Sequence, residues 1–145
     1  MLKRTSTAVW KGNGLEGKGA LTTQSGVFKE QPYSFQTRFV SEDGRAGTNP
    51  EELIAAAHAG CFAMQLSALL GNAGFTPTRL TATAKVYLEK EGAGFAIPRI
   101  ELSLEGSVPN ISAAEFQKHA ETAKATCPVS KALAGPAITL AVKLV

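Results

Sequence analysis

The sequence predicts one α+β domain over residues 1–145, and three observations support this fold class. The chain of 145 residues is 44% hydrophobic and 19% charged, which provides enough apolar side chains for a single core. Alternating apolar and polar residues predict strands, and two capped segments predict one long central helix and one shorter helix. The predicted order is β-β-β-α-β-β-α-β. Helices that interrupt runs of hairpin strands are typical of an α+β protein with an antiparallel sheet, and not of a doubly wound parallel sheet.

The N-terminal third is predicted to form strands joined by glycine-rich turns. Residues 4–11 and a short segment at 20–24 have strand character, with several glycines between them. These glycines match no phosphate-binding pattern such as GxGxxG, so we interpret them as turns. In residues 34–40, Phe35, Thr37 and Phe39 alternate with polar residues, which predicts a half-buried strand with Arg38 on its more polar face.

The central segment has the strongest helix signal. Asn49 is the predicted N-cap, Pro50 the first helical residue, and the helix is predicted to run to about Leu70. Residues 53–70 have nearly the length of a membrane span, but their Ala, Gly and polar content favours the buried helix of a soluble protein. A helix that is apolar on nearly all sides needs more cover than one small sheet can give. We therefore expect an obligate homodimer.

The C-terminal half is predicted to contain a long hairpin, a helix and a final strand. The hairpin strands are residues 79–90 and 96–108, joined by a glycine-containing turn. Ser112 and Glu115 form a predicted capping box at the start of the second helix. That helix should end near Cys127 because Pro128 cannot continue it. Residues 137–145 are the predicted last strand.

Composition also excludes several classes of function. The net charge is only +3, and the basic residues are scattered among acidic ones, so no nucleic-acid partner is expected. Two cysteines are too few for a disulfide scaffold, and no Cys/His cluster has the spacing of a metal site. No apolar signal segment follows the basic N-terminus. We expect a cytoplasmic protein with no cofactor, no bound metal and no membrane association.

The two cysteines are the residues most suited to chemistry, and several interpretations of them are open. Cys61 lies in mid-helix, where the helix dipole does not help to form a thiolate, so a reactive Cys61 needs a nearby cation such as Arg38. His58, three residues earlier, could activate Cys61 for acyl transfer as in a thioesterase-like enzyme, or be only a hydrogen-bonded helix residue. Both thiols could also be inert in a non-catalytic dimeric binding protein.

Cys127 allows two electrostatic interpretations. If a helix ends at Cys127, the negative end of its dipole opposes thiolate formation; if Pro128 begins a new turn, the effect is reversed. In either case Cys127 could attack an oxidised sulfur on Cys61.

Several segments together resemble the OsmC family of thiol peroxidases. The principal matches are Gly47–Leu53, Ala56–Phe62 and Cys127–Leu133. Weaker matches at Gly17–Gly19, Gln31–Tyr33, Arg38–Phe39 and Ala73–Pro77 extend the resemblance over nearly the whole chain. Val129, where the related organic hydroperoxide resistance proteins usually have an aromatic residue, favours the OsmC branch.

The resemblance implies an intertwined α+β homodimer that reduces organic hydroperoxides, and hydrogen peroxide less efficiently, in oxidative stress defence. It implies that Cys61 is the peroxidatic thiolate and Cys127 the resolving thiol, with Arg38 as the activating residue and Glu51 as the residue that orients it. Cys61 sulfenic acid and a Cys61–Cys127 disulfide would be the intermediates, reset by an external dithiol that could belong to a lipoylated protein.

Two further expectations concern geometry around this implied site. Phe39, Phe62 and Met64 are expected to line an apolar substrate pocket. Ten residues of helix separate Glu51 from Cys61, about 15 Å of rise. Either the chain near Glu51 curls back before the helix, or Arg38 switches between the two residues.

Overall fold

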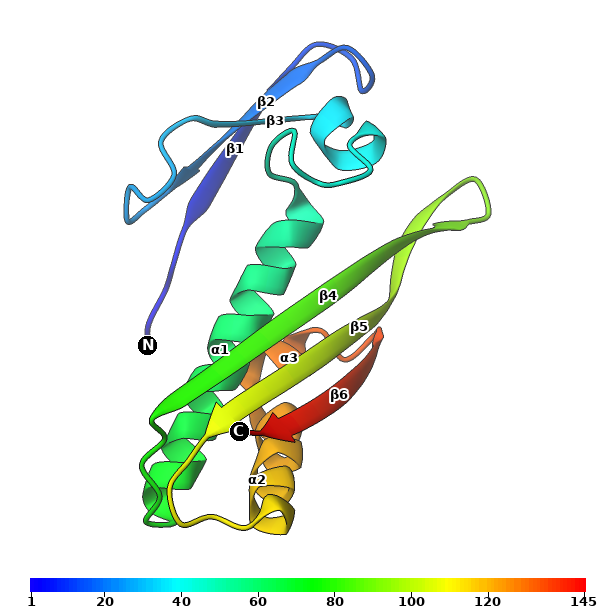
Figure 1. Cartoon of the computed structure of the whole chain (residues 1–145). Coiled ribbons are helices and arrows are strands. Elements are labelled where there is room, and N and C mark those ends of the chain that lie inside the picture. The colour runs from blue at the N-terminus through cyan, green and yellow to red at the C-terminus, as the bar shows by residue number, and fades with distance from the viewer. The chain divides into compact units, whose positions relative to one another are not determined.

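The computed structural model describes all 145 residues, which divide into two compact units, Met1–Leu53 and Ile54–Val145. The helix α1 (Pro50–Asn72) begins in the first unit and continues through the second (Figure 1). Contacts between residues are concentrated within each of the two units. That residues 1–145 form a single domain stays a prediction.

The first unit is a three-stranded antiparallel sheet followed by one short helix. The strands are β1 (Ser6–Lys11), β2 (Lys18–Thr23) and β3 (Gln31–Ser34), in that spatial order. The helix η1 (Gln36–Val40) has π-helical hydrogen bonding. Every residue of β1 is exposed, and none of the buried hydrophobic residues of the chain precedes Phe62. This unit therefore has no apolar core of its own.

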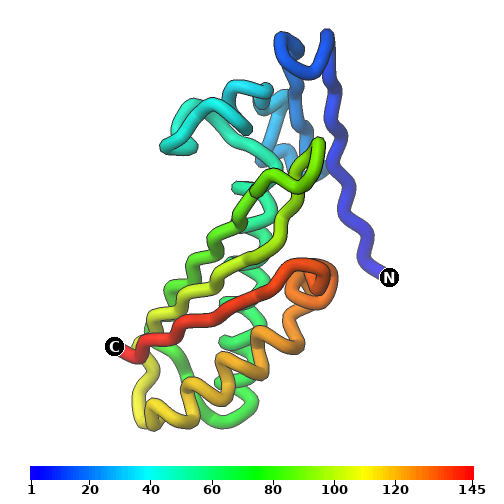
Figure 2. Tube along the Cα trace, turned by 90° about the vertical axis from the view of Figure 1, so that its right-hand side faces the viewer, coloured from blue at the N-terminus to red at the C-terminus, as the bar shows by residue number.

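The second unit contains the remainder of α1, a three-stranded sheet and two further helices. The strands are β4 (Arg79–Glu91), β5 (Gly94–Ser107) and β6 (Ala137–Leu144), and the helices are α2 (Ala113–Thr126) and α3 (Pro128–Ala132). Figure 2 shows the last strand, in red, returning beside α2, in orange. The predicted α+β class is confirmed.

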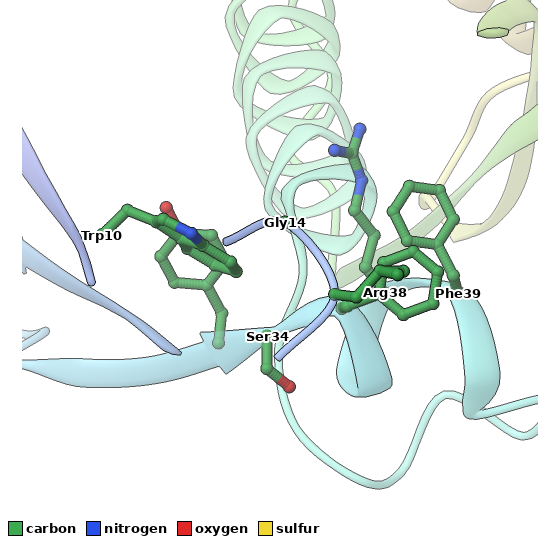
Figure 3. Close-up of a pocket in the computed structure, with 8 residues that line it drawn as sticks. Trp10, Gly14, Ser34, Arg38 and Phe39 are labelled. Carbon is green, nitrogen blue, oxygen red and sulfur yellow. The ribbon is translucent and has the colours of Figure 1, made fainter. Parts of the chain in front are cut away.

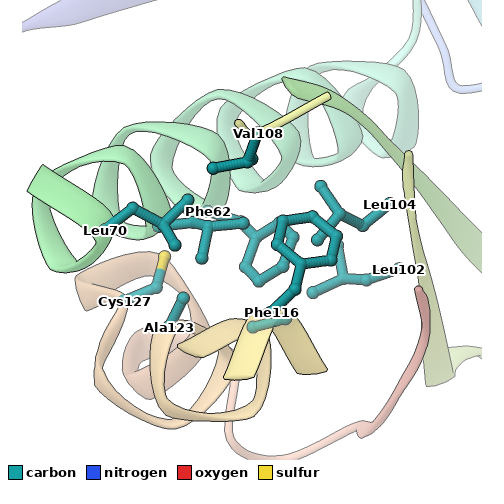
Figure 4. Packing of buried hydrophobic residues seen from close by; sticks show 10 residues of the cluster. Phe62, Leu70, Leu102, Leu104, Val108, Phe116, Ala123 and Cys127 are labelled. Atoms are coloured by element: carbon teal, nitrogen blue, oxygen red, sulfur yellow. The ribbon is translucent and has the colours of Figure 1, made fainter. Parts of the chain in front are cut away.

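The core of the second unit lies between α1, α2 and one face of the sheet (Figure 4). On β5, alternate residues are buried and the residues between them face outward. Most buried members of the core come from three elements: Phe62, Leu66 and Leu70 of α1, Leu102 and Leu104 of β5, and Phe116, Ala120 and Ala123 of α2. Val108 and Cys127, which lie just outside these elements, complete it. Burial of such side chains contributes about 1.5–3 kcal/mol each for the large ones, so this cluster fixes α1 against α2.

Local signals in the sequence account for the ends of the helices. Asn49 Oδ1 accepts a hydrogen bond from the Glu52 N–H at 2.9 Å, which confirms the predicted N-cap of α1. Gly74, with φ of +86°, follows the end of α1. The predicted capping box of α2 is present in both directions between Ser112 and Glu115. These caps satisfy backbone groups that would otherwise have no partner in the helix.

Two predictions about the strands were wrong. Residues 34–40 are not a strand, because β3 ends at Ser34 and η1 follows. The Thr37 hydroxyl accepts from the Ser34 N–H and donates to the Ser34 carbonyl, each at 3.0 Å, and these local bonds replace the ladder that a strand would need. The second sheet is also not fully antiparallel, since β6 pairs with β5 in parallel. The α2–α3 segment supplies the crossover that a parallel pair requires.

The long helix is buried on one face only. Its length and composition would suffice to cross a membrane, which is weak evidence because core helices of soluble proteins share these properties. Within the chain, 22% of its most apolar window is buried, so the central burial predicted from the sequence is incomplete. Met64, for example, is 76% exposed.

Gly106 provides a test of how tightly α2 packs on the sheet. A Cβ built at Gly106 would overlap the Phe116 ring and approach Leu80 Cδ2 to 3.2 Å. We expect Gly106→Ala to lower the free energy of unfolding by about 1–3 kcal/mol, because the ring cannot move without disturbing the core. Urea denaturation of the reduced protein would measure this change.

Gly71 is the matched control, since it lies in α1 and a Cβ there meets nothing within 4 Å. Gly71→Ala should leave stability unchanged or raise it by up to about 1 kcal/mol. Equal midpoints for Gly106→Ala and wild type would contradict the close packing.

Candidate active site

The second unit brings the two cysteines together. Cys61 lies in α1 and Cys127 lies between α2 and α3, and their sulfur atoms are 2.9 Å apart. Both are free thiols; Cys61 is half-buried and Cys127 is fully buried. Figure 4 shows the Cys127 side chain pointing from the end of α2 toward α1. A hydrogen bond of 3.1 Å from Gln65 to the Thr126 hydroxyl also joins the two helices beside this pair.

The position of Cys127 decides between the two interpretations of its electrostatics. Pro128 begins a new helix, α3, and Cys127 is its N-cap. The N–H groups of Val129 and Ser130 and the Ser130 hydroxyl lower the pKa of the Cys127 thiol, although Cys127 makes no side-chain cap hydrogen bond at this helix end. The end of α2 therefore does not determine the charge state of this thiol.

The two thiols have opposite shifts of their pKa values. Burial raises the pKa of Cys61, and the hydrogen bond with Cys127 raises it further. Burial also opposes ionisation of Cys127, but its interactions with Cys61, Ser130 and Val129 outweigh burial and lower its pKa. Sulfur atoms this close titrate as a pair. The pair loses its first proton more easily than an ordinary cysteine and holds its second more firmly.

Arg38 and Glu51 form a bidentate ion pair in the first unit. Arg38 Nη2 lies 2.7 Å from Glu51 Oε1, and Arg38 Nε lies 3.2 Å from each carboxylate oxygen. The carboxylate is largely buried. Arg38 comes from η1 and Glu51 from the first turn of α1, so the chain near Glu51 is already helical and does not curl back before the helix.

A cavity of about 460 Å³ lies beside Arg38 in the first unit. Figure 3 shows Trp10 on one side of it and Arg38 with Phe39 on the other. Its remaining lining comes from Gly14, Leu15, Tyr33, Ser34 and Phe35. Trp10 and Tyr33 pack with ring centroids 5.5 Å apart, and the Arg38 guanidinium lies 4.9 Å from the Phe39 ring centroid. The cavity is thus aromatic with one cationic group at its wall.

The predicted lining residues are only partly correct. Phe39 lines this cavity. Phe62 does not line a pocket, because it is fully buried in the core of the second unit. Met64 borders a separate depression of about 280 Å³ on α1. The helix periodicity explains the error, because positions 62 and 64 point to different sides of α1.

His58 is not arranged to activate Cys61. Its Nε2 lies 2.8 Å from the Ser130 hydroxyl, and its Nδ1 is buried without a hydrogen-bond partner. Burial lowers the pKa of His58, which keeps the ring neutral. His58 is thus hydrogen-bonded to Ser130, and this geometry does not support the Cys61–His58 acyl-transfer alternative.

Ser130 was not among the residues selected from the sequence. It contacts both Cys127 and His58, and it is only 5% exposed. The available signal was its place three residues after Cys127 at the start of a helix, where a hydroxyl can face the preceding side chain. Elsewhere in the chain, no three His, Cys, Asp or Glu side chains gather in a way that could hold a metal ion.

Fold and site together define an α+β protein with two free thiols close enough to form a disulfide. The family model described as OsmC-like protein matches residues 42–143. The chain is 52% identical over 132 residues to Peroxiredoxin OsmC of Escherichia coli, covering 91% of this chain and 90% of that protein. This chain belongs to the OsmC-like family.

Other relatives agree with this assignment. An organic hydroperoxide resistance protein-like protein of Staphylococcus aureus is 34% identical over 94 residues, which is 64% of this chain and 66% of that one. The crystal structure of an organic hydroperoxide resistance protein from Elizabethkingia anophelis matches 100% of this chain and 99% of its own with a TM-score of 0.72 and 27% identity. An OsmC-like protein from Mycoplasma pneumoniae shares the fold, with a TM-score of 0.76 at 17% identity. That match covers 99% of this chain and 98% of the other.

The coupling between the ionisations of the two thiols can be tested by titration. Thiolate absorbance at 240 nm should rise in two separate steps in the reduced protein, the first below and the second above the ordinary pKa of cysteine. In Cys127→Ser the remaining thiol should ionise at lower pH than the upper step of the wild type, because the hydrogen bond and charge that oppose its ionisation are lost. Simultaneous appearance of both thiolates at the ordinary pKa would contradict the coupling.

Proposed function

We propose that this protein is a thiol-dependent peroxidase that reduces organic hydroperoxides to alcohols, and hydrogen peroxide less efficiently, in oxidative stress defence. The single observation that supports it most is the 2.9 Å between the sulfurs of two free cysteines. At that distance an oxidised sulfur can be attacked by the other without a large movement of the chain. The names of the relatives, a peroxiredoxin and organic hydroperoxide resistance proteins, are consistent with this activity.

In the proposed reaction Cys61 is the residue that meets the peroxide, because it is the more exposed of the two thiols. Its thiolate attacks the distal peroxide oxygen, the O–O bond breaks, and the alkoxide takes a proton and leaves as the alcohol. Cys61 is then a sulfenic acid. Cys127 displaces its hydroxyl as water to form a disulfide, and an external dithiol returns two electrons and two protons.

We assign Arg38 the role of stabilising the thiolate and the charge that develops on the peroxide. Burial and Cys127 both raise the pKa of Cys61, so a cation is needed to favour its reactive form. Glu51 orients Arg38 through the bidentate pair. Of the two geometries considered for Glu51, the switching of Arg38 between Glu51 and the reacting groups is the one that we propose.

The aromatic cavity beside Arg38 is the proposed site for the organic group of the substrate. Trp10, Tyr33 and Phe35 offer apolar surface that hydrogen peroxide cannot use. Binding energy from this part of the substrate would favour an organic hydroperoxide.

We further propose that the protein works as a homodimer in the cytoplasm. A first unit without a core and an α1 helix buried on one face leave apolar surface that a second copy can cover. A reducing compartment keeps both cysteines available as thiols. The reductant is an external dithiol, for which a lipoylated protein is the candidate.

The first test is the intact mass of the reduced protein after one equivalent of cumene hydroperoxide, with free thiols alkylated. We expect each chain to lose two hydrogens, about 2 Da, because a disulfide forms within one chain. Cys61→Ser should keep an unreacted thiol, and Cys127→Ser should stop at the sulfenic acid. Two free thiols in the treated wild type would contradict the proposed function, and a covalent dimer would contradict a disulfide within one chain.

A second test separates chemistry from substrate selection. Arg38→Met should slow the consumption of cumene hydroperoxide and of hydrogen peroxide alike, by about 100-fold, because both reactions need the charge stabilisation. Trp10→Ala should lower kcat/KM for cumene hydroperoxide by about tenfold and leave hydrogen peroxide unchanged, because only the organic group uses the cavity.

Arg79→Met is the matched control for the loss of a cation, since Arg79 is exposed at the start of β4. It should behave as the wild type with both substrates. An equal loss with both substrates in Trp10→Ala would contradict the assignment of the cavity.

A further inference from the structure

A row of polar side chains extends from the two cysteines into the interior of the second unit. Cys127 is hydrogen-bonded to Cys61, Ser130 is the third residue after Cys127 and helps to lower the pKa of its thiol, and the Ser130 hydroxyl is hydrogen-bonded to His58 Nε2. The sulfur–sulfur distance is 2.9 Å and the His58–Ser130 distance is 2.8 Å. The proposed peroxidase reaction uses the two cysteines and gives no role to Ser130 or His58.

The inner members of this row of side chains are shielded from water. Cys127 and His58 are fully buried and Ser130 is 5% exposed. Water therefore cannot replace a hydrogen bond that is removed from this part of the molecule. In such surroundings a hydrogen bond to a charged sulfur is stronger than the same bond at the surface.

The direction of the hydrogen bonds follows from the protonation of His58. Burial lowers the pKa of this ring, so it is neutral and has one N–H group. With the proton on Nε2, His58 donates to Ser130 Oγ, and the buried Nδ1 is an acceptor without a donor. The other tautomer would bury an N–H group with no acceptor. Nε2–H is therefore the form that leaves the Ser130 hydroxyl hydrogen free to point at Cys127.

We propose that Ser130 is a catalytic residue of the disulfide-forming step, donating its hydroxyl hydrogen to the Cys127 sulfur, and that His58 is the positioning residue that aims this hydroxyl. The inference rests on the proposed peroxidase function and deepens it. It assigns to the resolving cysteine an activating group separate from Arg38, which serves Cys61.

The step balances without any further reactant. The Cys127 sulfur forms a bond to the Cys61 sulfur, and the S–O bond of the sulfenic acid breaks. The proton of the Cys127 thiol leaves with the departing hydroxide as water. As that proton leaves, negative charge develops on the Cys127 sulfur, and the Ser130 hydroxyl compensates for it until the S–S bond is complete.

The test measures the two chemical steps separately in one experiment. Reduced protein is mixed with cumene hydroperoxide, quenched with acid at successive times, and analysed by intact mass. Reduced chain, sulfenic acid and disulfide differ in mass, so the rates of formation of the sulfenic acid and of the disulfide are both obtained.

In Ser130→Ala we expect the sulfenic acid to form at the wild-type rate and the disulfide to form about 10–100-fold more slowly, because one hydrogen bond to a charged sulfur is lost. The sulfenic acid should therefore accumulate. Ser103→Ala, an exposed serine on β5, is the matched control and should leave both rates unchanged.

The role of His58 is tested by a pair of variants. His58→Leu removes the donor and should slow disulfide formation as Ser130→Ala does. His58→Gln keeps an N–H group near the position of Nε2 and should restore most of the rate. A role in packing alone predicts no such rescue, since neither side chain has the shape of an imidazole ring.

The outcomes distinguish this inference from the function on which it rests. A disulfide that forms at the wild-type rate in Ser130→Ala, or an equal slowing of both steps, would overturn the role of Ser130 while leaving the peroxidase intact. If the wild type itself forms no disulfide, the proposed function fails and this inference fails with it. Slow disulfide formation in Ser130→Ala, with rescue in His58→Gln, supports both.

Discussion

The packing of α1 against α2 is the constraint on which the redox centre depends. Phe62 and Leu66 belong with Phe116 and Ala123 to one buried core that also includes residues of β5. Cys61 and Cys127 lie at the edge of this contact, and their sulfurs are 2.9 Å apart because the helices are fixed there. A shift of about 1 Å between the helices would be a substantial fraction of that separation. The stability of the core and the reactivity of the thiols therefore depend on the same packing between elements.

Burial differs between the two sulfurs. The half-buried Cys61 is open to a small molecule and the fully buried Cys127 is shielded from one, which agrees with the roles that we propose for them. The same burial makes charge costly on both, and each needs its own compensation. For Cys127 that compensation is local, from the N–H groups of Val129 and Ser130 and from the Ser130 hydroxyl. For Cys61 the second unit supplies little compensation for a negative charge. We therefore assign this role to Arg38, which lies far from Cys61 in the sequence.

Features fixed by neighbours in sequence could be predicted, and those fixed by tertiary contacts could not. The N-cap at Asn49, the capping box at Ser112 and the hairpin all follow from local patterns. The alternation of residues 34–40 failed because two hydroxyl hydrogen bonds at Ser34 and Thr37 end the strand. Cysteine chemistry was predictable from residue type, whereas Ser130 depends on the geometry of a five-residue helix that no periodicity reveals.

The unpaired Nδ1 of His58 makes a purely structural explanation of the buried His58–Ser130 pair unsatisfactory. A buried ring nitrogen without a partner costs about 1–3 kcal/mol, and an apolar side chain of similar size would avoid that cost. Stability alone would therefore favour replacement of His58. The ring does, however, hold the Ser130 hydroxyl, for which we propose a role at the Cys127 sulfur. A polar group that weakens the core yet orients a donor at a reacting atom is typical of a functional site, in which local stability is given up for geometry.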